Sequence, residues 1–310
     1  MSELLVCGLI NIETTLRVEG FPIHYSPVRY PFYGVNSTVS GVGYNVARAL
    51  HRLGDRVTFL SLVGADLPGR VALQEIEAQG LDTGGVLPVL ERTPQSVILY
   101  DGTGARQINV DLKDIQERAY PPERFEPALE RCSLAVLCNL NLSRPFLRRA
   151  KQAGKPVATD VHTLHDLEDE YNRDYMAAAD ILFMSHERLP CPPEDWARRV
   201  LDRYPAEILV IGLGAEGALL AVRSDRFLER FPAVQVRPVV SAIGAGDALF
   251  SCFVHSYARS GDPYASLRRA VLYAGYKIGE EGAAEGLLDE AGLESLLDGE
   301  RDCYNTGHQG

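Results

Sequence analysis

Short apolar runs alternate with stretches of helical periodicity along most of the chain. The apolar runs have the length of buried strands: they are 4–9, 58–63, 134–137, 157–160, 181–184 and 208–211. Between and after them, apolar residues recur at helical spacing; these segments are 43–53, 70–79, 145–153, 197–204, 247–259 and 264–280. Strands that alternate with helices in this way predict a doubly wound, mostly parallel sheet with helices on both faces.

Two segments depart from this alternation. Residues 14–40 contain several prolines and many aromatic residues, which favours extended strands and turns. Residues 96–100 and 107–110 alternate around a turn at 101–104 and predict a hairpin. We therefore expect a small β-sheet lid formed by insertions at about 13–40 and 95–112.

These insertions belong to one predicted domain of residues 1–300. Near its end, strands at 219–222 and 234–236 are expected to form a β-meander. The polar tail at 301–310 is expected to be loose.

Composition and charge mainly exclude classes of function and location. The chain has 310 residues, of which 46% are hydrophobic and 24% charged, as in ordinary globular proteins. Its net charge of −11 argues against a nucleic-acid partner, because nucleic-acid binding depends on clustered Lys and Arg. No apolar run is long enough for a membrane span, and the N-terminal sequence resembles no export signal. The six cysteines form no CxxC pair, so we expect a cytoplasmic protein. The negative net charge favours a small molecule as its ligand.

The segment 239–253 carries the strongest chemical signal. An apolar strand end meets Gly244, Ala245 and Gly246, whose small side chains leave backbone amides free to converge on a phosphate at a helix N-terminus. Such fixed dipoles stabilise the charge of a γ-phosphoryl group in transfer. Asp247 follows immediately and can accept the proton of a hydroxyl in line with that group. Taken alone, the same tetrapeptide also fits a simple capped helix start.

This GAGD sequence, followed by an apolar helix, resembles the second signature of the PfkB (ribokinase) family of carbohydrate kinases, DTxGAGD. The resemblance implies that Asp247 is the catalytic base and that the Gly244–Gly246 loop is the anion hole. Ser241 and Ala242 stand where the family has Asp and Thr. In many members that Asp belongs to a monovalent-cation site, so its replacement argues against potassium activation.

The first family signature, GGxGxN, resembles residues 40–45, with Ser40 in place of the leading Gly. Gly41 and Gly43 would let a polyol approach the backbone closely, and Asn45 would bond a sugar hydroxyl. The alternative is a glycine turn with Asn45 capping a helix. Between them, Tyr44 fits either stacking on a ring of the substrate or filling the core.

Three further positions match substrate contacts of the family. Asn11 and Glu13, after the first strand, match an Asn and an Asp that hold sugar hydroxyls, although Glu13 also fits a strand end facing solvent. Asn141 falls where some members carry a substrate-contacting Glu. Arg106, on the predicted lid hairpin, fits a contact to an anionic substrate or an ordinary solvated charge.

The nucleotide end shows weaker patterns. Residues 212–217 resemble the family glycine loop near the ATP phosphates and ribose, which assigns Gly214 and Gly217 to nucleotide binding. Ser185 and Glu187 lie where the family has NxxE, whose Glu organises magnesium-bound water; here the acid comes one place early. A helix-start Ser with an acid in the first turn explains these two residues equally well.

By resemblance, the chain has a ribokinase-like three-layer α/β/α domain with a β lid. It would transfer the γ-phosphate of ATP, with Mg2+, to a hydroxymethyl group of a sugar, sugar derivative or nucleoside, and it would form a homodimer through the lid. The alternatives are a sugar-phosphate kinase of the phosphofructokinase type and a non-catalytic sugar-sensing relative. A nicotinamide-dependent dehydrogenase is disfavoured, because GxGxxG does not follow the first strand.

Overall fold

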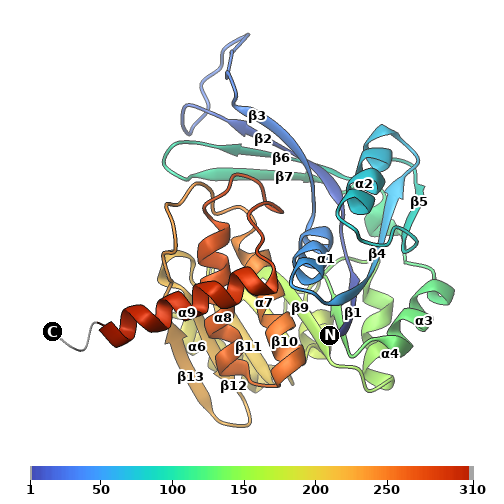
Figure 1. Cartoon of the computed structure of the whole chain (residues 1–310). Helices are drawn as coiled ribbons and strands as arrows, with labels where there is room; N and C mark the ends of the chain where they lie inside the picture. Colours follow the sequence, from blue (N-terminus) through green and yellow to red (C-terminus); the bar gives the residue numbers. More distant parts are fainter. Residues whose placement is uncertain (1, 307–310) are drawn as a thin grey trace.

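A nine-stranded, mostly parallel sheet forms the centre of the protein (Figure 1). The structure, a computed structural model, describes the backbone of residues 2–306 and the side chains of residues 2–299. The strand order is β13-β12-β11-β10-β9-β8-β1-β4-β5, and β12 is antiparallel to both of its neighbours. The strands are β1 (Glu3–Cys7), β4 (Arg56–Gly64), β5 (Val86–Leu90), β8 (Leu134–Leu137), β9 (Val157–Thr163), β10 (Ile181–Ser185), β11 (Ile208–Gly212), β12 (Ala218–Val222) and β13 (Phe227–Phe231).

Helices cover both faces of this sheet, because alternate side chains of its strands are apolar on both sides. In β1, Leu4 and Val6 join one core cluster, whereas Leu5 and Cys7 join the other. Side chains on the first cluster's face come from α1 (Val42–Arg52), α2 (Leu67–Ala78), α7 (Ala245–Ser260), α8 (Pro263–Lys277) and α9 (Glu290–Thr306). Those on the second come from α3 (Pro122–Arg131), α4 (Leu147–Gln152), α5 (Arg173–Ala178) and α6 (Pro193–Arg203). The predicted three-layer α/β/α fold is confirmed.

A second sheet of four strands stands off the main sheet at the top of Figure 1. Its order is β3-β2-β6-β7, and its strands are β2 (Asn11–Arg17), β3 (Val35–Ser40), β6 (Gln95–Tyr100) and β7 (Arg106–Asp111). β2 starts four residues after β1 ends, and α1 starts two residues after β3 ends. The predicted small β-sheet lid is therefore present, and its base meets the main domain where β1 ends.

The strand order reverses its direction between β1 and β8. The chain runs from β1 to β4 and β5 on one side, and from β8 to β13 on the other. Connections that leave in opposite directions open a crevice at the carboxyl ends of the two central strands, where ligands bind in open α/β sheets. The topology thus points to the ends of β1 and β8, beneath the lid.

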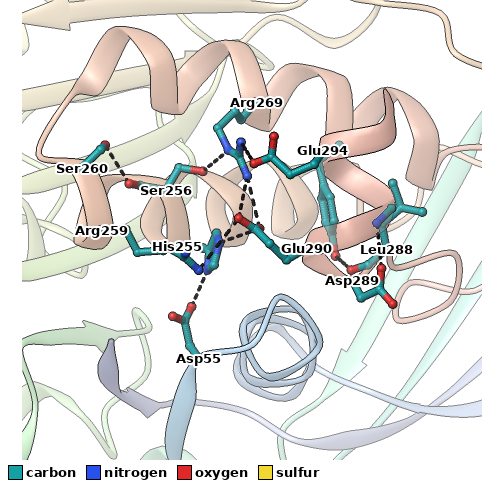
Figure 2. Close-up of polar contacts among 12 residues, drawn as sticks. Asp55, His255, Ser256, Arg259, Ser260, Arg269, Leu288, Asp289, Glu290 and Glu294 are labelled. Atoms are coloured by element: carbon teal, nitrogen blue, oxygen red, sulfur yellow. Dashed lines mark hydrogen bonds and ion pairs between the residues drawn. The ribbon is translucent and has the colours of Figure 1, made fainter. Parts of the chain in front are cut away.

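A polar cluster attaches the start of α9 to the rest of the domain (Figure 2). His255, on α7, lies with Nδ1 2.7 Å from Asp55 Oδ2 and with Nε2 3.0 Å from Glu290 Oε2. Arg269, on α8, donates from Nη2 to Glu290 Oε1 at 3.1 Å. The side chains of Asp55 and His255 are fully buried. This cluster joins the turn before β4 to three helices.

Two expectations about the C-terminal part are wrong. The strand after β12 is Phe227–Phe231, not 234–236. The turn between β12 and β13 places Arg226 at a φ of 53°, so the chain reverses early, and Val234 and Val236 pack against the core instead. The tail was predicted to be loose from residue 301, but α9 continues through Thr306. Residues 307–310 lie outside the described part of the chain.

Candidate active site

Gly244 shapes the turn that leads into α7. Its φ is 77°, in the left-handed region that favours glycine. A Cβ at this position would lie 2.4 Å from the carbonyl oxygen of Ala283, so a side chain cannot fit. The turn is held by bonds from the Ile243 amide to Ser241 Oγ at 3.2 Å and from the Ala245 amide to the Ala242 carbonyl at 3.2 Å. Residues 241–245 therefore form a fixed bend at the mouth of the helix.

The first turn of α7 presents unused donors beyond this bend. Within the described part of the chain, the amides of Gly246 and Asp247 donate to no protein acceptor. Gly246 also borders open space, since a Cβ added there would meet no heavy atom within 4 Å. Free amides at the positive end of a 16-residue helix attract an anion. These residues can cradle a phosphate group of a nucleotide.

Asp247 lies half-buried directly beside these amides. Burial raises the pKa of its carboxyl group, the bond from Asn45 and the charges of His162 and Lys277 lower it, and Asp160 raises it further. Asn45 donates from Nδ2 to Asp247 Oδ2 at 2.7 Å. Asp247 is thus a carboxylate whose proton affinity is increased, next to an anion site.

A buried polar cluster lies at the base of the lid. Asn11 donates from Nδ2 to Ser96 Oγ at 3.0 Å, and Ser40 donates to Glu13 Oε2 at 3.2 Å. Ser40 Oγ also lies 3.4 Å from the side-chain amide of Asn45. Hydrogen bonds therefore connect Glu13 through Ser40 and Asn45 to Asp247, across 234 positions of sequence.

Two acceptors in this cluster lack a protein partner. Asn11 is 3% exposed and Glu13 is 7% exposed, yet Asn11 Oδ1 and Glu13 Oε1 receive no hydrogen bond from the described residues. Burial is also the largest influence on Glu13 and raises the pKa of its carboxyl group. Buried acceptors without donors are rare in folded proteins, and the hydroxyl groups of a polyol would satisfy them. Asn11 and Glu13 thus suit a ligand rich in hydroxyls.

Gly41 and Gly43 lie where the start of α1 approaches the end of β1. Gly41 has a φ of 104°, and a Cβ there would lie 2.7 Å from the carbonyl oxygen of Leu9. A Cβ on Gly43 would lie 2.7 Å from the Cα of Gly8. These contacts press the start of α1 against the end of β1, which places Asn45 over the crevice. Tyr44 is fully buried in the core, so it does not stack on a substrate.

The side chain of Asn141 is hydrogen-bonded to neighbouring protein groups. Its Nδ2 donates to the Gln116 carbonyl at 2.9 Å, and its Oδ1 accepts from Arg144 Nε at 3.0 Å. The Gln116 side chain in turn accepts from the Asn141 backbone amide at 3.0 Å. Both ends of the Asn141 side chain are therefore satisfied by protein, unlike those of Asn11 and Glu13.

The predicted nucleotide loop lies at the ends of β10 and β11. Ser185 pairs with Gly212 in the sheet, and its hydroxyl accepts from the Glu187 amide at 3.2 Å. Gly214 and Gly217 have φ values of 61° and 101°. A Cβ on Gly217 would lie 2.1 Å from the Phe231 carbonyl oxygen, so this glycine is needed for the turn into β12. The structure therefore brings the two predicted nucleotide motifs together.

Glu187 makes a contact that the sequence did not predict. Its Oε1 lies 3.6 Å from Arg106 Nη2, on β7 of the lid, and the Glu187 side chain is 57% exposed. The lid hairpin thus reaches the main domain at the nucleotide loop. Magnesium carried by ATP needs only one or two carboxylates beside the phosphates and water. An exposed acid at this loop fits that demand.

Sequence reasoning missed several residues of the crevice. Ser40 and Ser96 complete the cluster with Asn11 and Glu13, but serines give no distinctive signal. Asp160 and His162, at the end of β9, act electrostatically on Asp247. Lys277 does so too, from α8, and its place in an apolar helical segment was the available signal. No helix in the described residues is long and apolar enough to cross a membrane.

Similar proteins align with almost the whole chain. It is 26% identical over 295 residues to acarbose 7(IV)-phosphotransferase from Actinoplanes sp., spanning 94% of this chain and 97% of the relative. It is 28% identical over 289 residues to ATP-dependent ribose-1-phosphate kinase from Halopiger xanaduensis, spanning 91% and 94%. The solved structure of the microbiome-derived acarbose kinase Mak1 has a TM-score of 0.85 at 26% identity, covering 96% of this chain and 99% of that one.

A structure described as a putative ribokinase from Agrobacterium tumefaciens shares the fold, with a TM-score of 0.84 at 22% identity and coverage of 97% and 99%. The pfkB family carbohydrate kinase pattern matches residues 1–290, which include both glycine signatures, the lid and the loop before α7. This protein belongs to the pfkB family of carbohydrate kinases.

Proposed function

We propose that this kinase transfers the γ-phosphoryl group of ATP to a hydroxymethyl group of a sugar, sugar derivative or nucleoside. Asp247 is the general base, and the Gly244–Gly246 loop is the anion hole. The observation that carries the proposal is the hydrogen-bonded chain from Glu13 through Ser40 and Asn45 to Asp247. It joins acceptors that lack donors to a carboxylate at a helix N-terminus with free amides.

The proposed reaction follows from this geometry. The acceptor hydroxyl gives its proton to Asp247 while its oxygen forms a bond to the γ-phosphorus. The bond between that phosphorus and the β–γ bridging oxygen breaks, and ADP leaves with the electron pair. The amides of Gly246 and Asp247 stabilise the charge on the phosphoryl oxygens. Asn11 and Glu13 orient the acceptor.

Magnesium enters the proposal as the partner of ATP. It neutralises charge on the β and γ oxygens when bound. Glu187 remains our candidate for holding water on that ion, while Ser185, Gly214 and Gly217 border the nucleotide. Asn141 is the least supported of the proposed substrate contacts, because Gln116 and Arg144 already satisfy its side chain.

A sugar-phosphate kinase is the second candidate. It is favoured by the relative that acts on ribose 1-phosphate. Arg106, the cation proposed for an anionic substrate, is engaged with Glu187 in this structure. A panel of sugars, glycosides, nucleosides and sugar phosphates, assayed for ADP release, separates the two candidates. A protein that binds a sugar without releasing ADP would instead be the sensing relative.

The decisive variant is Asp247→Asn. We expect kcat to fall about 10²-fold or more while KM for the acceptor changes little, because the amide cannot accept the proton. Asp202→Asn, at an exposed position on α6, is the matched control and should keep wild-type turnover. Unaltered turnover in Asp247→Asn would reject the assignment of the base.

A further inference from the structure

Lys277 is a fully buried lysine that the proposed reaction does not use. It is the last residue of α8, and its relative exposure is 0%. Burying an ammonium group costs free energy unless the charge is paired and hydrogen-bonded. A buried lysine therefore needs neighbouring groups that pair with its charge.

The contacts of this lysine lead to the bend before α7. Its Nζ donates to the carbonyl oxygen of Ile243, the residue immediately before Gly244. Its neighbour Ile278 accepts from the amides of Val240 at 2.8 Å and Ser241 at 3.0 Å. Residues 277 and 278 thus hold both ends of the segment that ends in the anion hole.

Carboxylates face this ammonium from three parts of the structure. They are Asp247 on α7, Glu13 on β2, and Glu280 and Glu285 in the segment after α8. Burial, the largest influence, lowers the pKa of Lys277, and these four charges raise it, so that the net pKa is about 8. The ammonium form therefore predominates at neutral pH. It therefore acts electrostatically on both Asp247 and Glu13.

The bend itself, residues 241–246, carries no charged side chain. Ser241 and Ala242 are uncharged, and the Ser241 hydroxyl is taken by the Ile243 amide. A carbonyl oxygen beside an anion site attracts a cation, and here the chain supplies one covalently. Unlike a dissolved ion, a lysine side chain has full occupancy at any salt concentration.

We propose that Lys277 is a positioning residue, a built-in cation that fixes the Ile243 carbonyl and hence the amides of the anion hole, and that makes phosphoryl transfer independent of added monovalent ions. The inference rests on the proposed roles of Asp247 and the Gly244–Gly246 loop. It differs from them in requiring an intramolecular cation.

Ion dependence and chemical rescue test the inference. The wild type should have equal kcat in potassium chloride and in tetramethylammonium chloride at the same ionic strength. Lys277→Ala should lose at least about 10-fold in kcat, because a displaced loop misaligns the phosphoryl group. Ethylammonium or ammonium should restore a measurable part of that loss. Lys155→Ala is the matched control, since Lys155 Nζ donates to the carbonyls of Glu130 and Cys132 at 2.9 and 2.7 Å, away from the crevice.

Three results would overturn the inference. They are a wild type that requires potassium, a Lys277→Ala variant with wild-type kcat, and a loss in Lys277→Ala that no amine restores. Lys277→Met guards against misfolding, because an apolar side chain of similar length replaces the buried charge. Thermal unfolding should show that it is folded, while kcat falls as in Lys277→Ala.

Nucleotide binding separates this inference from the proposed function. If the wild type transferred phosphate to no acceptor, the proposed reaction would be wrong, but calorimetric titration with a non-hydrolysable ATP analogue, which retains the γ-phosphoryl group, would still test Lys277. We expect weaker binding of this analogue by Lys277→Ala and recovery with ethylammonium. Unchanged affinity for the analogue would reject the role of Lys277.

The pH dependence of kcat/KM distinguishes the proposed role of Lys277 from a purely structural one. In the wild type, kcat/KM should fall as the pH rises through about 8, because the ammonium facing Asp247, Glu13, Glu280 and Glu285 loses its proton. Lys277→Met should lack that alkaline limb. An identical limb in both proteins would assign it to another group and contradict the inference.

Discussion

At the scale of residues, Asn45 and burial shift the pKa of Asp247 in opposite directions. Burial favours the neutral acid, and the bond from Asn45 favours the carboxylate. The general base that we propose must be ionised to accept a proton, so we expect Asn45 to set how far activity extends toward acid pH. Glu13, Ser40 and Lys277 belong to the same electrostatic group.

Removing this bond should move the acid limb of the pH profile. In Asn45→Leu, the pKa of Asp247 rises further, so kcat/KM should reach its plateau at a higher pH than in the wild type. Gln79→Leu removes a similar amide–carboxylate bond, to Glu75 Oε1 at 2.9 Å, outside the crevice and is the control. An acid limb unmoved in Asn45→Leu would show that Asp247 does not limit the rate at low pH.

The raised pKa of Asp247 also predicts an effect on stability. Because the folded pKa lies above the ordinary value of 3.8, the contribution of this group to folding is greatest below that value and declines as the pH rises through the folded pKa. Asp247→Asn, which carries no charge, should therefore unfold at a higher temperature than the wild type at pH 7. The difference should shrink on acidification. A lower melting temperature at pH 7 would contradict this assignment.

The sequence predicted some of these residues and not others. The motifs placed Asn11 and Glu13 after the first strand, where β2 begins, and Asn45 and Asp247 at the starts of α1 and α7, and these four residues converge. Lys277 could not be placed, because lysine is ordinarily exposed and its burial depends on the packing of α8 against α7.

At the scale of elements, the lid hairpin and the nucleotide loop meet through Arg106 and Glu187. An exposed ion pair of this kind contributes only about 0–1 kcal/mol to stability. Its interest lies in the competition between two proposed roles of Glu187, as a partner of the lid and as an organiser of magnesium-bound water.

Two variants distinguish these roles. If Glu187 organises the metal, Glu187→Gln should lower kcat/KM for MgATP about 10-fold, as loss of a residue around a metal site does. Arg106→Gln breaks the same ion pair but leaves the acid, so it should retain most activity. Equal losses in both variants would assign the effect to the lid contact instead.

The cluster around His255 predicts how α9 is held (Figure 2). His255→Leu leaves the fully buried Asp55 carboxylate without its partner, so the free energy of unfolding should fall by about 3 kcal/mol or more. Adding Asp55→Leu removes the stranded charge, so the double variant should be more stable than the single variant. Urea unfolding measures both. A single variant as stable as the wild type would refute the role of the cluster.

The two elements that differed from prediction have identifiable causes. In α9, Leu293, Leu296 and Leu297 recur at helical spacing and pack on the core, but the polar residues beyond them suggested a loose tail. In β13, charged Glu229 and Arg230 obscured a strand whose partners are set by the early turn at Arg226. The helical periodicity of α9 can be recognised in the sequence, whereas the turn geometry that sets the partners of β13 cannot.

At the scale of the whole molecule, the alternation of strands and helices was enough to predict the layers of the fold. The order of the strands in space was not available, since sequence periodicity does not say on which side of β1 each strand lies. The pattern of residues 14–40 and 96–110 also predicted the lid, although its two parts are separated by α1, β4, α2 and β5.

We expect a homodimer through the lid, because its edge strand β7 is exposed along its whole length. Ile108, on this strand, is 52% exposed. Exposed strand edges tend to pair with a second chain. Light scattering should give about twice the chain mass of 34.1 kDa, and Ile108→Lys should reduce it toward one chain. Val89→Lys, at a 54% exposed position on β5, is the control. A monomeric wild type would contradict the prediction.

Glu13 belongs to a strand of the lid, whereas Asp247 belongs to a helix of the main domain, and the bonds through Ser40 and Asn45 cross from one to the other. These bonds couple the position of the lid to that of Asp247. If Glu13 holds an acceptor hydroxyl as we propose, an acceptor analogue without that hydroxyl should leave the lid less firmly placed, so hydrolysis of ATP by water should increase relative to transfer to the analogue.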